Sequence, residues 1–360
     1  MTSSRVVSRV VIDARYVGDT LHGMARYTLL MAKGLSELKL SYTPVFLVQP
    51  GMAGKFSGFE TREVSTPFLN PRELVEIPRV LNEIRADLYH SPTFSSLAYC
   101  PCPSVVTIHD LNHLTYGGLK EKLYYLLLLK RFARSSKKVL TVSQFSRGEI
   151  ADWLEMSQDK IRVVYNAIDS ELAEPISDSE IAQVLGKYQL VKGGYFFCLS
   201  NPKPHKNVEL LVEAFQKFRL ENDRIPLVLS MNEFAERPGV KALGGFSDRE
   251  TRALIAGSKA LFFPSLYEGF GLPPVEAAVV GIPVVVSDIS AHREALQDLA
   301  ADEAIWIDPS DTELWTQAML RASRGELGAT RPETRRAILT RYAVSRLGIE
   351  MNEVYREFLM

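Results

Sequence analysis

The chain has little cysteine and no long apolar run. Among 360 residues only three are cysteine, at Cys100, Cys102 and Cys198, which is too few and too odd in number for a disulfide framework. We therefore expect free, buried thiols. No apolar stretch approaches the ~18 residues of a membrane-spanning helix, and no signal peptide precedes the first expected strand. These absences predict a protein of the reducing cytoplasm.

Two motifs of nucleotide-dependent enzymes are also missing. No D-x-D sequence occurs, so a divalent metal that bridges phosphates would lack obvious ligands. No G-x-G-x-x-G follows the first expected strand, and no acidic residue is placed there to receive an adenosine ribose. The first absence predicts a reaction without metal or cofactor. The second argues against a nicotinamide-dependent oxidoreductase.

Composition and charge are those of an ordinary globular protein. The length suggests two domains, and a content of 46% hydrophobic and 24% charged residues is typical. The net charge is −1, but Lys and Arg outnumber Asp and Glu in residues 1–170, and the reverse holds in the remainder. A basic first half suggests an anionic ligand or surface, although dispersed surface charge explains the asymmetry about as well. No nucleic acid is expected as a partner.

Short apolar runs rich in Val, Ile and Phe alternate with helical patterns along the chain. Such runs suit parallel strands that are covered on both faces. Two successive series of strands and helices predict an α/β protein of two doubly wound domains. The expected strands span residues 6–12, 45–48, 87–90, 104–108, 138–142 and 161–165, then 195–199, 227–230, 240–243, 260–263, 282–286 and 304–307.

The boundary between the domains is expected soon after residue 165. Residues 169–180 are polar, contain a proline and lack a clear period, which indicates a linker. We therefore place the first domain at residues 1–170 and the second at residues 171–344. An amphipathic pattern in residues 332–360 predicts helices at the end of the chain.

The most informative segment is residues 264–288, PSLYEGFGLPPVEAAVVGIPVVVSD. A buried strand leads into a loop with Gly269 and Gly271, where backbone can approach a ligand closely. The two prolines that follow suit the first turn of a helix, and a later glycine ends that helix. The N–H groups and the partial positive charge at the start of such a helix suit a phosphate.

Two glutamates flank this phosphate site. Glu268 precedes the glycine loop, and Glu276 lies inside the expected helix. A carboxylate repels a phosphate, so beside one it is suited to accept hydrogen bonds from the hydroxyl groups of a sugar or a ribose. Taken alone, the two glutamates are also compatible with a helix cap and a solvated helix face.

One string in this segment, EGFGLPPVEA followed by GIPVV, resembles the E-x7-E signature of retaining glycosyltransferases of family 4. The resemblance implies the GT-B fold, in which two Rossmann-like domains face each other across a cleft. It also implies that a final helix, about residues 345–360, completes the first domain. The implied activity is transfer of a hexose from a UDP- or GDP-linked sugar to a hydroxyl of a glycan or lipid-linked glycan. The resemblance implies that this reaction serves polysaccharide biosynthesis.

The resemblance also assigns roles in the second domain. It places Glu268 at the hexose, as a catalytic residue, and Glu276 at the ribose. It implies that Lys206 and the backbone of the glycine loop bind the diphosphate, and that the turn at residues 243–250 binds the base. With Lys206 and Glu276, the predicted donor-binding residues of this domain are Ser200, Asn201, Gly245, Phe246, Gly269, Phe270, Gly271 and Leu272. The turn before Lys206 departs from the family pattern, because His205 replaces an Arg.

Two positions of the first domain complete the prediction. Gly23 belongs to a turn, GDTLHGMARY, that resembles the family's G-x-G-R-Y pattern with Ala25 in place of the second glycine. The resemblance makes Gly23 a donor-binding candidate, where backbone approaches the donor or the acceptor. His109 ends an expected strand, where ligands of open α/β sheets gather. The resemblance places His109 at the transferred sugar, as the second catalytic candidate. Without it, an ordinary β–α turn and a hydrogen-bonded structural histidine explain these two residues.

Two further interpretations stay open. A sugar-nucleotide epimerase can share the two-domain scaffold, and so can a non-catalytic nucleotide-binding protein. Residues 120–138, KEKLYYLLLLKRFARSSKK, combine a Leu and Tyr run with Lys and Arg. This segment suits peripheral contact with an anionic membrane surface. A core helix over about residues 120–134, with basic ends, is the simpler interpretation.

Overall fold

The computed structural model describes residues 7–18, 23–174 and 176–359. The chain divides into two compact units, each with its own core. The first unit combines the chain up to Ala167 with Tyr342–Met360, and the second comprises Ile168–Arg341. The sequence places these boundaries at residues 170 and 344.

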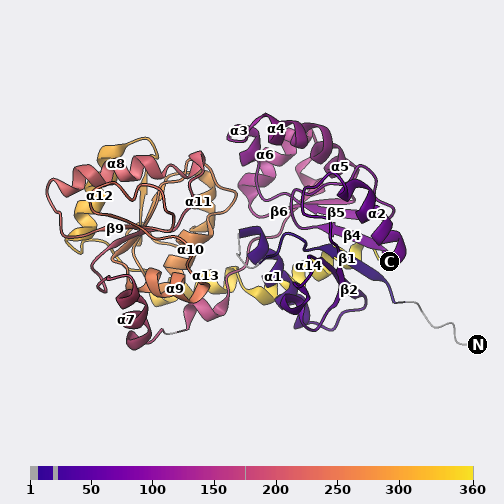
Figure 1. Ribbon diagram of the computed structural model, residues 1–360, viewed down its shortest axis with the longest axis horizontal. Coiled ribbons are helices and arrows are strands. Elements are labelled where there is room, and N and C mark those ends of the chain that lie inside the picture. The colour runs from indigo at the N-terminus through magenta and orange to yellow at the C-terminus, as the bar shows by residue number, and fades with distance from the viewer. Residues whose placement is uncertain (1–6, 19–22, 175, 360) are drawn as a thin grey trace, which may run out of the picture. The chain divides into compact units, whose positions relative to one another are not determined.

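The first unit is built on a seven-stranded parallel sheet with the order β3-β2-β1-β4-β5-β6-β7 (Figure 1). The central strands are buried because helices cover the sheet, and Val10, Val11 and Ile12 of β1 have no exposed surface. The strands are β1 (Arg9–Asp13), β2 (Thr43–Val48), β3 (Glu60–Glu63), β4 (Leu88–Ser91), β5 (Ser104–Thr107), β6 (Lys138–Thr141) and β7 (Ile161–Val163).

Strand β3 is absent from the sequence prediction. Its sequence, ETRE, lacks the apolar alternation of a half-buried strand, and its side chains are mostly exposed. It forms because β2 offers a free edge, to which β3 pairs in parallel from Glu60 to Glu63. A charged edge strand also discourages pairing with other molecules.

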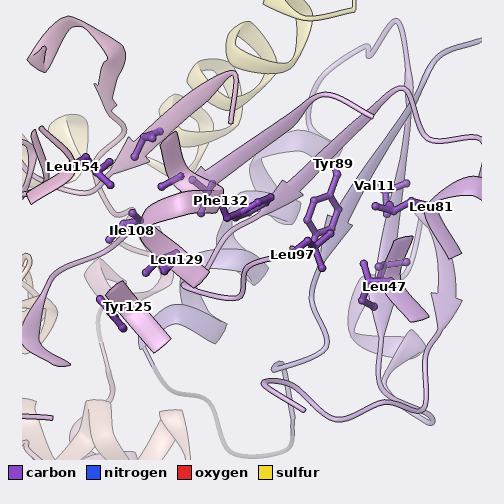
Figure 2. Close-up of a cluster of buried hydrophobic side chains, with 14 of the residues drawn as sticks. Val11, Leu47, Leu81, Tyr89, Leu97, Ile108, Tyr125, Leu129, Phe132 and Leu154 are labelled. Carbon is purple, nitrogen blue, oxygen red and sulfur yellow. The ribbon is translucent and has the colours of Figure 1, made fainter. Parts of the chain in front are cut away.

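Helices of the first unit pack around a core that contains the residues of Figure 2. They are α1 (Gly23–Ser36), α2 (Glu73–Ile84), α3 (Asn112–Thr115), α4 (Leu119–Tyr124), α5 (Lys130–Ser135), α6 (Gln144–Leu154) and α14 (Val344–Glu357), with the short turns η1 (Ala53–Phe56), η2 (Tyr125–Leu129) and η3 (Gln158–Lys160). None of the described helices is both long and apolar enough to cross a membrane.

The last helix, α14, lies against α1 of the first unit. Two glycines allow this close approach, since a Cβ on Gly34 would lie 2.4 Å from the carbonyl oxygen of Val344. A Cβ on Gly348 would lie 2.3 Å from the carbonyl oxygen of Gly34. Beyond the crossing, the Tyr355 hydroxyl lies 2.6 Å from Nδ1 of His90 in the sheet. The end of the chain therefore belongs to the first unit.

The second unit contains a six-stranded parallel sheet with the order β10-β9-β8-β11-β12-β13. This is the doubly wound strand order of a Rossmann-like domain. The order in which successive strands are added to the sheet reverses between β8 and β11. These two strands pair in parallel through Phe196 and Phe197 of β8. The strands are β8 (Phe196–Cys198), β9 (Leu227–Leu229), β10 (Val240–Ala242), β11 (Ala260–Phe263), β12 (Val284–Ser287) and β13 (Ala304–Ile307).

Helices of the second unit form two contacting groups. Helices α8 and α12 pack together, and α10 contacts both α9 and α13. The elements are η4 (Ser170–Ala173), α7 (Asp178–Lys187), η5 (Pro204–Lys206), α8 (Val208–Arg219), α9 (Asp248–Gly257), α10 (Leu272–Val280), α11 (Ser290–Ala295), α12 (Thr312–Ser323) and α13 (Pro332–Arg341).

Three local expectations are corrected by the structure. The polar segment 169–180 is only partly a linker, because Ser177 caps α7 by accepting from the Glu180 N–H at 3.2 Å. Cys198 is buried as expected, whereas Cys100 and Cys102 are half-buried free thiols with their Sγ atoms 4.0 Å apart. The expected helix over residues 120–134 has a π-helical turn in its middle, at η2.

The glycine crossing of α1 and α14 yields a test. We expect Gly348→Ala to lower the free energy of unfolding by about 1–3 kcal/mol, because the new methyl group overlaps backbone atoms that belong to α1. Urea denaturation followed by circular dichroism measures the change. Gly186→Ala in α7 is the control, since open space surrounds Gly186. Equal stability of Gly348→Ala and the wild type would contradict the close approach.

Candidate active site

The second sheet brings two distant segments of the sequence together. Ligands of open α/β sheets bind beyond the carboxyl ends of the strands, where the strand order reverses. In this sheet the reversal lies between β8 and β11. The turn after β8 carries Lys206, and the loop after β11 carries Glu268 and the two glycines. The topology therefore places both predicted motifs at one site.

Lys206 and Glu268 form an ion pair at the centre of this site. The Lys206 Nζ lies 2.6 Å from the Glu268 Oε1, and the Ser265 hydroxyl donates to the same oxygen at 2.7 Å. The side chains are only 14% and 11% exposed. Burial raises the pKa of Glu268, but the charge of Lys206 and the hydrogen bonds from Lys206 and Ser265 outweigh it, so the pKa is lowered overall. Glu268 is therefore a carboxylate at neutral pH.

Backbone and amide contacts hold the two segments together. The Leu266 N–H donates to the carbonyl of His205 at 2.7 Å. Asn207 has a left-handed backbone, with φ of 53°. From there its side-chain amide donates to the carbonyl of Pro264 at 3.2 Å and to that of Pro309 at 2.7 Å. These bonds fix the position of Lys206 relative to Glu268.

The glycine loop ends at Gly271, which is the N-cap of α10. Gly271 has a φ of 94°, and a Cβ there would lie 2.8 Å from Cδ2 of His292, so only glycine fits. Pro273 and Pro274 in the first turn have no N–H. The backbone donors at this end of α10 are therefore those of Gly271 and Leu272. The predicted start of this helix with its proline pair is confirmed, and so is Gly281 as its C-cap, with φ of 95°.

The remaining loop and helix residues surround this helix end. Phe270 is 3% exposed and Glu276 is 2% exposed, so both side chains are buried. Gly269 in the loop is buried as well. Glu276 follows Leu272 by one helical turn and lies on the same side of α10. The two glutamates of the motif thus lie on either side of the start of α10 in the chain, Glu268 in the loop before it and Glu276 within the helix.

Four predicted donor residues follow strands on the other side of the reversal. Ser200 comes after β8, and its N–H and carbonyl both bond to the Ser230 hydroxyl at 2.7 Å. Asn201 is exposed and accepts from the Lys203 N–H at 3.2 Å. Gly245 and Phe246 come after β10, where Gly245 is exposed with φ of 78°.

Phe246 is half-buried against two rings of the second unit. Its ring meets that of Tyr188 edge to face at 5.4 Å, and that of Phe197 at 6.3 Å. These contacts fix the turn after β10 at the carboxyl edge of the sheet. The turn thus follows β10 at the same carboxyl edge of the sheet as Lys206 and Glu268.

The two predicted residues of the first domain lie at its own sheet edge. His109 follows β5 and donates from Nε2 to the Pro92 carbonyl at 3.0 Å, with the ring of Tyr27 edge to face at 4.9 Å. Burial lowers the pKa of His109, against the smaller opposite effects of the Pro92 bond and Asp110, so the ring is neutral. Gly23 is exposed at the start of α1. Residues 19–22 of its predicted turn lie outside the described residues. That these two residues share a site with Glu268 stays a prediction.

Two residues of the second unit were missed by the sequence analysis. Ser265 bonds directly to Glu268, and His292 on α11 is fully buried with its ring 5.5 Å from that of Phe263. The available signal was their position after β11 and β12, since the carboxyl ends of parallel strands share one edge of the sheet. Across the described ranges, no group of three or more His, Cys, Asp and Glu side chains could hold a metal ion.

Comparison with known proteins identifies related sequences for both halves. The family described as Glycosyltransferase Family 4 matches residues 21–172, and Glycosyl transferases group 1 matches residues 187–340. An O-antigen chain mannosyltransferase B from Escherichia coli is 30% identical over 355 residues, covering 87% of this chain and 90% of the relative. The O-antigen chain mannosyltransferase RfbU from Salmonella typhimurium is 28% identical over 226 residues, covering 59% of each.

A solved structure shows the same fold. HepE from Anabaena, crystallised in complex with UDP-glucose, has a TM-score of 0.74 and 15% sequence identity, with 97% of this chain and 99% of that chain covered. The similarity of fold extends over both units, which are the two Rossmann-like domains of the GT-B architecture.

Removal of Lys206 tests the central ion pair. We expect Lys206→Met to lower the free energy of unfolding at neutral pH by about 3 kcal/mol, because a buried carboxylate loses its cation. The loss should shrink as the pH falls and Glu268 becomes protonated, since the variant raises the pKa of this carboxyl.

Denaturant unfolding of the single and double variants at neutral and acidic pH measures this effect. Adding Glu268→Gln to Lys206→Met should restore most of the lost stability, because no unpaired charge remains buried. Additive effects of the two substitutions would show that the side chains do not interact.

Proposed function

The chain belongs to glycosyltransferase family 4 and is a hexosyltransferase, and from this we propose that it transfers mannose from GDP-mannose to a hydroxyl of an O-antigen-like polysaccharide. The similarity to the mannosyltransferase from Escherichia coli over nearly the whole length carries this proposal. UDP-linked hexoses are the competing donors. The acceptor is proposed to be a glycan or a lipid-linked glycan.

On the donor side we propose an exchange of partners by Lys206. In the ligand-free site its ammonium group bonds to Glu268. A nucleotide diphosphate at the start of α10 offers a stronger acceptor, so Lys206 moves its hydrogen bonds to the phosphate. The carboxylate of Glu268 is then available to accept from a hexose hydroxyl. The same pair thus holds the empty site in shape and binds both parts of the donor.

Other residues of the second domain receive the nucleoside. Glu276 is proposed to accept from the ribose hydroxyls, and the turn with Gly245 and Phe246 to hold the base. Ser200 and Asn201 follow β8 on the same edge and complete the surroundings of the diphosphate. Support comes from the position of all these residues at the carboxyl edge of one sheet.

We propose that transfer proceeds with retention and without a metal. The bond between the anomeric carbon and the phosphate oxygen breaks, and the acceptor oxygen bonds to that carbon from the same face. The proton of the acceptor hydroxyl passes to the departing diphosphate. Lys206 and the N–H groups of Gly271 and Leu272 stabilise the charge that develops on the leaving group. The absence of a D-x-D sequence supports a reaction that needs no bridging cation.

His109 is proposed to contact the transferred sugar from the first domain. Its Nε2 hydrogen is committed to the Pro92 carbonyl, so Nδ1 carries the lone pair and can accept from a sugar hydroxyl. Gly23, exposed at the start of α1, leaves room for a ligand on the same unit.

We further propose that the helical segment from Leu119 to Ser135 rests on an anionic membrane. Its inner face is buried in the core through Tyr125, Leu129 and Phe132 (Figure 2). Its outer face is apolar, contrary to a simple core helix. The exposed fractions there are 73% for Leu119, 45% for Leu123, 52% for Leu126 and 65% for Leu127.

Charge favours a lipid surface as the occupant of this apolar face. Lys120, Arg131 and Arg134 are exposed on the same segment, and Glu121 is its single acidic residue. Exposed leucines ringed by basic side chains match the acyl boundary and the phosphate headgroups of an anionic bilayer. A membrane-bound enzyme of this kind would meet a lipid-linked glycan directly.

The donor assignment is tested with Glu276→Ala and His109→Ala. We expect Glu276→Ala to weaken GDP-mannose binding about 10- to 100-fold, the value of a hydrogen bond to a charged group. His109→Ala should lower kcat and leave donor affinity almost unchanged. Calorimetry in EDTA gives the affinity, and mannose transfer to a glycan acceptor gives kcat.

The controls of this test separate the alternatives. Glu209→Ala, an exposed glutamate of α8, should change neither quantity. Wild-type affinity in Glu276→Ala would disprove the ribose contact. Tighter binding of UDP-glucose than of GDP-mannose would overturn the choice of donor, and an epimerised product from donor alone would indicate epimerase chemistry.

The membrane contact is tested by flotation with lipid vesicles. The wild type should float with vesicles that contain phosphatidylglycerol and stay behind with pure phosphatidylcholine, and salt should weaken the binding. Replacing Leu123, Leu126 and Leu127 with Gln should abolish flotation. Leu220→Gln, at an 88% exposed leucine of the second unit, is the control. Equal flotation of both variants would exclude this surface.

A further inference from the structure

His292 presents an unused hydrogen-bonding atom to the start of α10. Its ring has no exposed surface, and its Nδ1 lies 2.9 Å from the carbonyl oxygen of Ser287. A carbonyl only accepts, so Nδ1 carries the hydrogen and Nε2 carries a lone pair. Among the described residues, Nε2 has no hydrogen-bond partner.

The edge of the ring that bears Nε2 faces Gly271. A Cβ on Gly271 would lie 2.8 Å from Cδ2 and 3.1 Å from Nε2. Gly271 is the N-cap of α10, at the proposed diphosphate position. Two more buried hydroxyls of the same sheet edge, those of Ser200 and Ser287, also lack a partner in the part of the chain described. Unsatisfied buried polar atoms are uncommon in folded proteins. Nε2 of His292 is such an atom and lies beside the N-cap of α10, which points to a ligand at that position.

We propose that His292 is a proton-linked positioning residue of the donor site. It is neutral in the empty enzyme and takes up one proton from solvent when a nucleotide diphosphate binds at the start of α10. No other bond is made or broken in this step. The imidazolium then supports the glycine loop and balances the charge of the diphosphate. This inference rests on the proposed donor site.

The charges around His292 explain the two protonation states. Burial lowers the pKa of His292 in the empty enzyme, Glu268 opposes this, and Lys206 adds to it. Two charged residues near His292 in the chain, Arg293 and Asp288, pair with each other at the surface, with the Arg293 Nε 2.6 Å from the Asp288 Oδ1. A bound diphosphate adds negative charge and draws Lys206 away from Glu268. Both changes raise the pKa of His292.

The sign of the pH dependence follows from this shift. Donor binding takes up a proton when the pH lies between the lower pKa of the empty enzyme and the higher pKa of the complex. In that interval the affinity rises as the pH falls, by at most tenfold per pH unit for one proton. Above and below the interval the affinity is constant. The diphosphate of a sugar nucleotide is fully ionised throughout, so it adds no slope of its own.

Calorimetry of donor binding measures the proton directly. GDP-mannose is titrated into the protein at one pH near neutrality, in two buffers with different ionisation enthalpies. The difference in observed heat gives the number of protons taken up. We expect a substantial fraction of one proton for the wild type and none for His292→Asn, whose amide can still donate to Ser287. The affinity of His292→Asn should no longer vary with pH.

Two controls keep the outcome decisive. His113→Asn, at a half-buried histidine of the first unit, should retain the wild-type proton uptake. Imidazole nitrogen chemical shifts in the wild-type protein report the state of His292 without any substitution, and they should change from neutral to imidazolium when donor is added. A neutral His292 in the complex, or unchanged uptake in His292→Asn, overturns the proposal while donor binding itself stands. Failure of every sugar nucleotide to bind overturns the donor site as well.

Discussion

The ion pair between Lys206 and Glu268 is the interaction on which the second domain's site depends. It joins a turn after β8 to a loop after β11, two segments separated by more than sixty residues, with a Nζ–Oε1 distance of 2.6 Å. A buried pair of this kind adds little net stability. Its importance is that it holds one cation and one carboxylate at the reversal of the strand order. In the proposed function, these two opposite charges bind a diphosphate and a sugar.

The first domain also has buried ion pairs after a strand of its sheet, but they are formed by an arginine and two carboxylates. At the end of β1, the guanidinium of Arg15 bonds to Asp13 at 2.7 Å and to Glu73 of α2 at 3.0 Å, and all three side chains are buried. The Tyr89 hydroxyl of the neighbouring strand β4 also donates to Asp13, at 3.1 Å. In this sheet the charges are fully satisfied by one another, so they fix loops. In the second sheet Lys206 and Glu268 pair with each other, whereas Nε2 of the neighbouring His292 has no hydrogen-bond partner among the described residues.

Strong local signals explain why much of the fold could be predicted. The apolar runs at β11 and β13 coincide with the expected ranges, because burial on both faces demands continuous apolar sequence. The prediction omitted strand β3. Its charged sequence does not indicate a strand, and it pairs only because β2 leaves an edge of the sheet open. A helix over about residues 120–134 was predicted, but its periodicity could not tell which leucines point to solvent, because both of its faces are apolar.

The sequence by itself determined the glycine loop, the proline pair, the two glutamates and the family to which the chain belongs, because these depend on residues close together in the chain. Only the tertiary structure decided that Lys206 bonds to Glu268, that Gly34 and Gly348 meet, and that the lone pair of His292 faces Gly271. Such contacts depend on strand order and helix crossing, which bring distant residues within a few ångströms. A pattern of residues close together in the sequence does not predict those distances.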